Sequence, residues 1–241
     1  MIAATDPRYP NVYRDVVAHS ITGEAVGIEH YSRMIPLARS LDERLDLLED
    51  AYHEKLHLLG MREVGRRLNV PEKTDIDGPY WRRVRHAFRE RADAGDLLAC
   101  YVMQDIVLET FAVVLYDAVL PGSDPFAAER IRVIAAEERD HLAHGIHALT
   151  DAYCQDPSGL QERVNYANER VARVLAEWIG PEACGPHCGV CHAECAKLDL
   201  HLLEVDMVTT QARFVGDYGA ALRSIGFPAA DVTRWLARLP G

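Results

Sequence analysis

Two short units in the chain pair a glutamate with a histidine three positions later. They are Glu54-Lys-Leu-His57 and Glu138-Arg-Asp-His141. Residues three positions apart lie on the same face of a helix, so each unit can direct a carboxylate and an imidazole at one point. Oxygen and imidazole donors are the ligands that divalent transition metals such as iron and manganese accept, so each unit is half of a possible metal site.

A single glutamate precedes each of these units by about the same distance. Glu24 lies 30 residues before Glu54, and Glu109 lies 29 residues before Glu138. Both lone glutamates are flanked by apolar residues at helical spacing, as expected for a helix that faces a protein core. The chain therefore contains one pattern twice, a lone glutamate followed about 30 residues later by Glu-x-x-His.

Together these residues match the ligand set of carboxylate-bridged di-metal helical bundles, in which two helices give one glutamate each and two give a Glu-x-x-His. Four carboxylates buried together repel one another unless cations compensate them. Two divalent ions would balance four negative charges, and we predict two irons, one of which could be manganese. The predicted ligands are Glu24, Glu54, His57, Glu109, Glu138 and His141.

The segments that must position these ligands have helical periodicity, and no alternating strand pattern competes with it. Ser40-Leu-Asp-Glu43 is typical of a capping box at a helix start, and Pro125 is placed for the first turn of another helix. We predict an all-α bundle of about eight helices with the di-metal site in its core, built as a single domain over residues 1–241. The predicted helices span about 11–40, 41–68, 79–92, 96–120, 124–153, 158–179 and 196–225, with a short helix after Pro228.

Charge and hydropathy exclude several classes of function. The formal net charge of −11 argues against nucleic-acid binding, which needs a concentrated basic patch. The longest apolar region, 97–120, contains Gln104, Asp105, Glu109 and Asp117, so it indicates a helix buried in protein rather than a membrane span. The first ten residues lack an apolar run behind a basic segment. We therefore expect a cytoplasmic protein without a membrane span.

A second candidate metal site lies in a cysteine-rich segment at 180–197. Four thiolates can close a tetrahedral zinc site that staples a loop. The same four residues could instead hold an iron–sulfur cluster, or act as redox-active or unliganded thiols. The cysteines concerned are Cys184, Cys188, Cys191 and Cys195.

Along nearly its whole length, the chain resembles the cyanobacterial aldehyde-deformylating oxygenases, or aldehyde decarbonylases, which are ferritin-like di-iron proteins. The most specific stretch is Ser123-Asp-Pro-Phe-Ala127. Two departures stand out: Val64 occupies a position where that family usually has a cysteine, and segment 180–197 is an insertion. The other stretches that carry the resemblance are Gly23-Glu24 with Tyr31, Glu54-x-x-His57 followed by Gly60 and Leu68-Asn-Val70, Gln104 before Glu109-Thr-Phe-Ala, Glu138-x-x-His141-Leu142 and Leu222-Arg-Ser-Ile-Gly-Phe227.

The resemblance implies a di-iron centre that reacts with O2 as co-substrate, and a hydrophobic channel for a small apolar organic substrate. It implies an electron donor such as ferredoxin with its reductase. It also implies that Tyr31, Gln104 and Tyr116 orient the metal ligands.

Several functions remain compatible with these residues. An oxygenase of this kind could carry out aldehyde deformylation, hydroxylation or desaturation, or N-oxygenation. The alternatives are a ferritin-like iron-storage protein with ferroxidase activity but no organic substrate, and a metal-stapled binding protein with a degenerate site. The long C-terminal extension beyond four bundle helices disfavours storage, and the intact six-ligand set disfavours a degenerate site.

Overall fold

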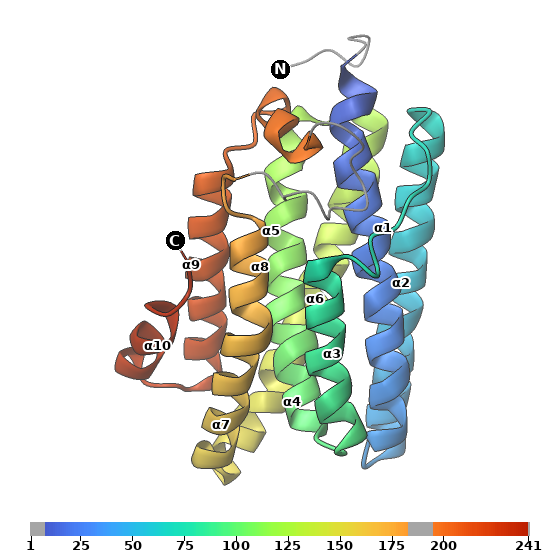
Figure 1. Cartoon of the computed structure of the whole chain (residues 1–241). Coiled ribbons are helices and arrows are strands. Elements are labelled where there is room, and N and C mark those ends of the chain that lie inside the picture. The colour runs from blue at the N-terminus through green and yellow to red at the C-terminus, as the bar shows by residue number, and fades with distance from the viewer. Residues whose placement is uncertain (1–7, 183–194, 241) are drawn as a thin grey trace.

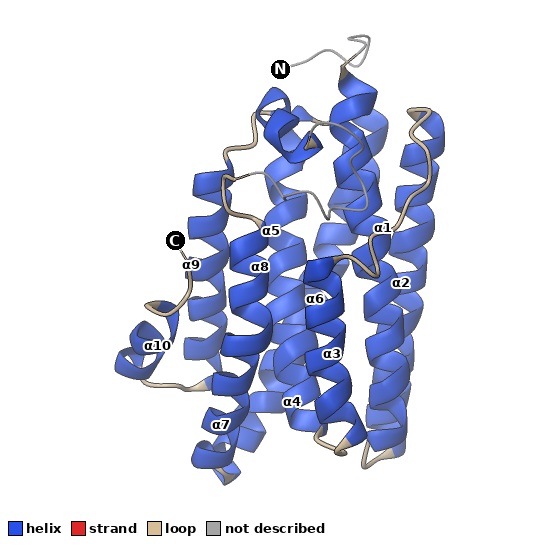
Figure 2. Ribbon diagram, viewed as in Figure 1, coloured by secondary structure: helices blue, strands red, loops and turns tan. Residues whose placement is uncertain are grey.

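The computed structural model describes residues 8–182 and 195–240, and this part of the chain folds into helices without strands (Figures 1 and 2). Eight helical rods follow one another, and two of them contain a π-helical turn. The rods are α1 (Tyr9–Met34), α2 (Leu41–Arg67), α3 (Pro79–Asp93), α4–α5 (Leu97–Tyr101 and Glu109–Val119, joined by the π-helical Val102–Leu108), α6 (Pro125–Gln155), α7–α8 (Pro157–Ala167 and Arg173–Trp178, joined by the π-helical Asn168–Ala172), α9 (Met207–Ile225) and α10 (Ala229–Leu236).

Side-chain caps fix where the central helices begin. The hydroxyl of Ser40 accepts a hydrogen bond of 3.0 Å from the backbone N–H of Glu43, which starts α2. The carboxylate of Asp124 accepts from the N–H groups of Phe126 and Ala127 and starts α6, with Pro125 in its first turn. Both helix starts were predicted from the sequence, and both are confirmed.

Four of the rods, α1, α2, α4–α5 and α6, form the central bundle (Figure 1). α1 and α2 are antiparallel neighbours, as are α5 and α6, and the long connection from α2 to α4 contains α3. The rod Leu97–Gly122 is apolar enough to cross a membrane, with a mean hydropathy of 1.7, but 89% of that window is buried inside the bundle. It is therefore the central core helix, as the sequence predicted, and it carries Glu109 into the interior.

The prediction of one helix over 196–225 was wrong. Ala196–Leu203 (η5) is a 3-10 helix, and it ends at Glu204, whose φ of +64° is in the left-handed region. Asp206 then caps α9. A Cβ on Gly122 would lie 2.4 Å from the carbonyl oxygen of Leu203, so the end of η5 packs tightly on the end of the core rod. The chain therefore turns at Glu204 and begins a new helix after Asp206, instead of continuing as one helix.

Candidate metal centre

The central bundle brings all six predicted ligands together in its interior. Glu24 comes from α1 and Glu109 from α5, whereas α2 and α6 each contribute a Glu-x-x-His unit. Every one of these side chains is at most 4% exposed. The three-residue spacing within each unit points the glutamate and the histidine at the same place, as helix geometry requires. The six residues are Glu24, Glu54, His57, Glu109, Glu138 and His141.

Their donor atoms form two overlapping groups, and within each group the atoms lie within 4.8 Å of one another. Glu54 and Glu138 belong to both groups, so each can offer an oxygen to either side of the centre. This is the arrangement that two neighbouring cations with bridging carboxylates require. The first group is Glu24, Glu54, His57 and Glu138, and the second is Glu54, Glu109, Glu138 and His141.

Several atoms in the cluster lack a well-aligned hydrogen bond although they are fully buried. They are the Nδ1 atoms of His57 and His141 and one carboxylate oxygen each of Glu54 and Glu138. The Nδ1 atom of His141 nevertheless lies 3.2 Å from Glu138 and 3.6 Å from Glu54. Buried polar atoms normally have hydrogen-bond partners, so converging lone pairs without them fit a site built for cations.

The electrostatics of the cluster lead to the same interpretation. Burial, with repulsion from Glu138, raises the pKa of Glu54 well above its usual value and that of Glu109 to about 7. Burial alone would lower the pKa of His141, but hydrogen bonds to Glu109 and Glu138 raise it to about 12. The metal-free cluster therefore holds extra protons, which bound cations would displace.

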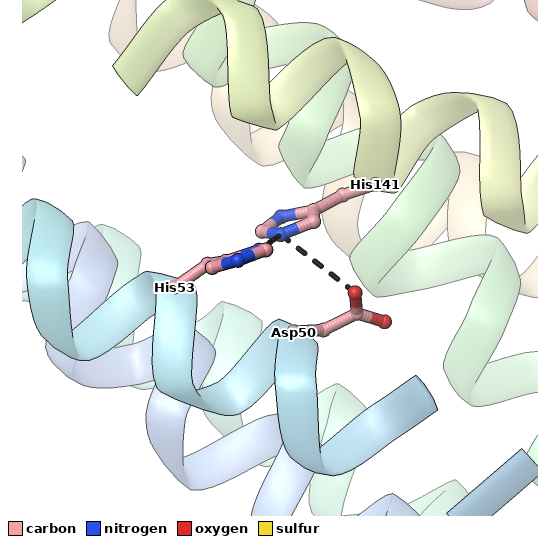
Figure 3. Close-up of side chains that lie close together, drawn as sticks. All are labelled: Asp50, His53 and His141. Atoms are coloured by element: carbon pink, nitrogen blue, oxygen red, sulfur yellow. Dashed lines mark hydrogen bonds and ion pairs between the residues drawn. The ribbon is translucent and has the colours of Figure 1, made fainter. Parts of the chain in front are cut away.

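The outer nitrogen of each histidine faces a further polar group. Nε2 of His57 lies 2.7 Å from a carboxylate oxygen of Glu137. Nε2 of His141 lies 3.3 Å from Nδ1 of His53 and 3.7 Å from Asp50, both from α2 (Figure 3). A carboxylate hydrogen-bonded to a ligating histidine fixes the ring and its tautomer, so Glu137 is placed to orient His57, whereas the hydrogen-bond partner of His141 is His53.

A cavity of about 110 Å³ opens beside the cluster. Four of the candidate ligands line it: Glu24, Glu54, Glu109 and Glu138. The wall beyond them is mainly apolar and aromatic, and a few polar side chains lie near η5. The apolar lining includes Trp81, Leu108, Phe111, Ala112, Leu115 and Trp178, and the polar lining includes Asp15, His19 and Lys197.

Residues 6–180 match the profile of the family described as long-chain fatty aldehyde decarbonylase. The chain belongs to this family. Among solved structures, it is similar to a protein from Synechococcus described as protein 19 with aldehyde deformylating oxidase activity. The TM-score is 0.81 at 21% sequence identity, covering 98% of this chain and 100% of that chain. The predicted resemblance and the all-α, ferritin-like fold are thus confirmed, and as an aldehyde decarbonylase family member the chain is an enzyme.

The three residues predicted to orient the ligands all contact the carboxylates in this family member. The hydroxyl of Tyr31 lies 3.1 Å from Oε1 of Glu109 and 3.2 Å from Asp105. The side-chain amide of Gln104 donates to the same Glu109 oxygen at 2.8 Å. The hydroxyl of Tyr116 donates a hydrogen bond to Glu24. Each lone glutamate therefore has a neutral donor that holds one of its oxygens.

Two histidines around the centre were not predicted to be site residues. His30 is fully buried, its Nδ1 lies 2.6 Å from Oε1 of Gln104, and its ring stacks on Phe88. Burial lowers the pKa of His30 to about 3, so its imidazole is neutral. His144 lies 3.1 Å from Asp50. Asp140 and His144 have a four-residue spacing in the sequence, which fits a surface group or a group that supports a ligand, whereas His30 and Asp50 are isolated and no motif pointed to them.

Most of the cysteine-rich segment lies outside the residues that the structure describes. Cys184, Cys188 and Cys191 lie outside the described residues, and Cys195 is half-buried at the start of η5. The match to the decarbonylase family ends at residue 180, where this segment begins. The zinc, iron–sulfur and redox hypotheses therefore stay predictions.

Proposed function

We propose that the protein is a non-haem di-iron oxygenase that uses O2 to deformylate an apolar aldehyde. One observation carries the proposal: the two ligand groups that share Glu54 and Glu138 also form the wall of a mainly apolar cavity. A site for two cations and a space for an apolar molecule are therefore adjacent. Because the chain belongs to the long-chain fatty aldehyde decarbonylase family, we expect its substrate to be an aldehyde.

Glu24, His57, Glu109 and His141 would each hold one of the two ions, and Glu54 and Glu138 would hold both. Bound iron would supply the one-electron redox chemistry by which O2 reacts with an organic molecule. The protein side chains keep the carboxylates in place and exclude water, since all six lie in the interior. Electrons would come from an external donor such as ferredoxin with its reductase.

The cavity supports binding of the reacting end of the substrate. Leu108, Phe111 and Leu115 offer an aliphatic chain apolar contact beside Glu109, and the carboxylates of the cluster form a polar part of the same wall. A cavity of about 110 Å³ is somewhat smaller than the roughly 150 Å³ cavity that admits benzene. The interior as it stands thus fits a short aldehyde, and a longer chain requires the lining side chains to move.

The test is a single-turnover reaction with the full chain, loaded anaerobically with ferrous iron and supplied with a reductant, O2 and aliphatic aldehydes of increasing length. Deformylation removes the aldehyde carbon, so we expect formate and a hydrocarbon one carbon shorter. Glu138→Ala should abolish both products, whereas Asp140→Asn, an exposed acid on the same helix, should retain them. Oxidation of iron far beyond two ions per chain without any organic product would instead identify a storage protein.

For the cysteine segment we propose a structural zinc ion held by Cys184, Cys188, Cys191 and Cys195, in a cytoplasmic protein. Four cysteines within twelve residues support it, because four closely spaced thiolates can close a tetrahedral zinc site, and in a cytoplasmic protein they would stay reduced. Elemental analysis of protein expressed with both metals should give two irons and one zinc per chain. A Cys188→Ser/Cys191→Ser variant should lose the zinc and keep the iron, whereas acid-labile sulfide in the wild type would identify an iron–sulfur cluster.

A further inference from the structure

Helix α2 presents an apolar stripe to the outside of the bundle. In the described part of the chain, eight large hydrophobic side chains are exposed, and six of them lie on this helix. Successive members are three or four residues apart, so at 3.6 residues per turn they share one face over a length of about 27 Å. The apolar stripe consists of Leu41, Leu45, Leu48, Tyr52, Leu56 and Leu59, with exposed fractions from 40% for Leu59 to 71% for Leu41.

This pattern reverses the usual arrangement of a surface helix, which buries its apolar face. The inner face of α2 carries Asp50, Glu54 and His57, which are all buried at the candidate metal centre. The leucines of the apolar stripe therefore lie outside the hydrophobic core of the bundle. A contiguous apolar patch of this length on a protein surface marks an interaction site.

Charged residues border the apolar stripe, and their signs differ on its two sides. Asp42 and Glu49 each follow a stripe residue by one position and form an acidic edge. Arg44 and Lys55 each precede a stripe residue by one position and form a basic edge. All four side chains are exposed, and none of them forms an ion pair with another described residue. These charges are therefore available to a partner that offers the complementary pair of edges.

We propose that the apolar stripe is the interface of a homodimer, in which α2 packs against α2 of a second copy of the chain. The two helices are parallel and related by a two-fold axis, because this arrangement places the acidic edge of each helix against the basic edge of the other. Arg44 then meets Glu49 of the partner subunit, five positions further along, where flanking charges pair in parallel coiled coils. In an antiparallel pair, the acidic edges of the two helices would face each other, and so would the basic edges.

The position of α2 allows this pairing. The helix forms an outer edge of the bundle, at the right of the view in Figure 1, with its stripe turned away from the core. A lipid surface is the rival occupant of an exposed apolar stripe. The acidic edge and the net charge of −11 oppose binding to the anionic headgroups that attract most peripheral proteins. A second copy of the chain buries the leucines of the stripe and also pairs the charges on its two edges.

Light scattering coupled to size exclusion tests the dimer on the full chain. We expect a mass of twice the 27.0 kDa of one chain. The variant Leu48→Glu/Leu56→Glu should elute at the mass of a single chain with unchanged helicity and iron content. The control is Val208→Glu, which places one such charge on an exposed residue of α9, away from the apolar stripe, and should stay dimeric. A wild-type chain that is monomeric up to about 100 µM, or that floats with neutral lipid vesicles as a monomer, overturns the proposal.

A charge exchange tests the parallel orientation. Arg44→Glu should weaken dimerisation at least tenfold, because it places like charges opposite Glu49 of the partner subunit. Adding Glu49→Arg should restore most of the affinity, since the edges are then complementary again. A double variant that dimerises no better than the single one contradicts parallel pairing.

Discussion

The side-chain amide of Gln104 lies 2.8 Å from a carboxylate oxygen of Glu109, five residues further along the same rod. In a regular α-helix, residues three or four apart are neighbours, and residues five apart are not. The π-helical turn over Val102–Leu108 widens the helix and brings these two residues together. Local distortion of the core helix thus places both a candidate ligand and the group that holds it.

We expect Gln104→Leu to weaken iron binding at the Glu109 side by about 10- to 100-fold, because the carboxylate loses the donor that fixes its orientation. Gln104→Glu should be at least as damaging, since it adds a carboxylate beside Glu109. Anaerobic titration with ferrous iron, followed by competition with a chelator, measures the affinity. Equal iron affinity in Gln104→Leu and wild type would show that the hydrogen bond does not position the ligand.

Gly27 on α1 permits the approach of Glu54 from α2. A Cβ added to Gly27 would lie 2.2 Å from Oε2 of Glu54, whereas a Cβ on Gly23 would meet only Trp81, at an ordinary 3.4 Å. Gly27→Ala should therefore displace Glu54 and lower the iron content, and it should destabilise the fold by about 1–3 kcal/mol, as overpacking does. Gly23→Ala, one turn away, is the control and should keep its iron. Metal analysis and urea unfolding distinguish the two variants.

The sequence predicted the central bundle and the six candidate ligands because both depend on short-range spacing. Glu54 and His57 share a helix face by their three-residue separation alone, and the two copies of the pattern required four helices to meet. Asp124 and Pro125 likewise predicted a helix start, since capping is decided within a few residues.

What the sequence did not predict depends on tertiary packing. The π-helical turn before Glu109 has no marker in composition, and it is stabilised by what surrounds the core rod. η5 ends at Glu204, where Leu203 packs closely against Gly122, a residue 81 positions away in the sequence. Asp50 approaches His141 only because α2 and α6 are adjacent, and the sequence gives no spacing between them.

The buried carboxylates should make the metal-free protein less stable than a partly neutralised one. Glu54 lies close to Glu24, Glu109 and Glu138, and burial with repulsion from these groups raises its pKa. Glu54→Gln removes one potential charge, so it should raise the melting temperature of the metal-free chain. With ferrous iron at about 100 times Kd, the wild type should gain about 2.7 kcal/mol and the variant much less. Calorimetry should therefore show that Glu54→Gln has the higher melting temperature without iron and that the wild type has the higher one with iron.

Glu29 makes the interface between α1 and α3 sensitive to acid. Its carboxylate lies 2.5 Å from Arg89 and 2.9 Å from Arg85. Burial alone would raise the pKa of Glu29, but hydrogen bonds from Arg89 and Arg85 lower it below the ordinary value. A lowered pKa stabilises the fold above the unfolded-state value of about 4.3, and this contribution is lost as the pH falls through the folded-state pKa.

Glu29→Gln should consequently lower the urea midpoint at pH 7, where the wild-type carboxylate is ionised and paired. The difference between variant and wild type should shrink below about pH 4, because the wild-type carboxylate then becomes protonated and also loses its pairing. Glu90→Gln is the control, since Glu90 is on the adjacent α3 face and its carboxylate meets the hydroxyl of Tyr166 instead of an arginine. A constant difference between Glu29→Gln and wild type from pH 7 to pH 3 would mean that Glu29 acts through packing, because only an ion pair loses its contribution when the carboxylate is protonated.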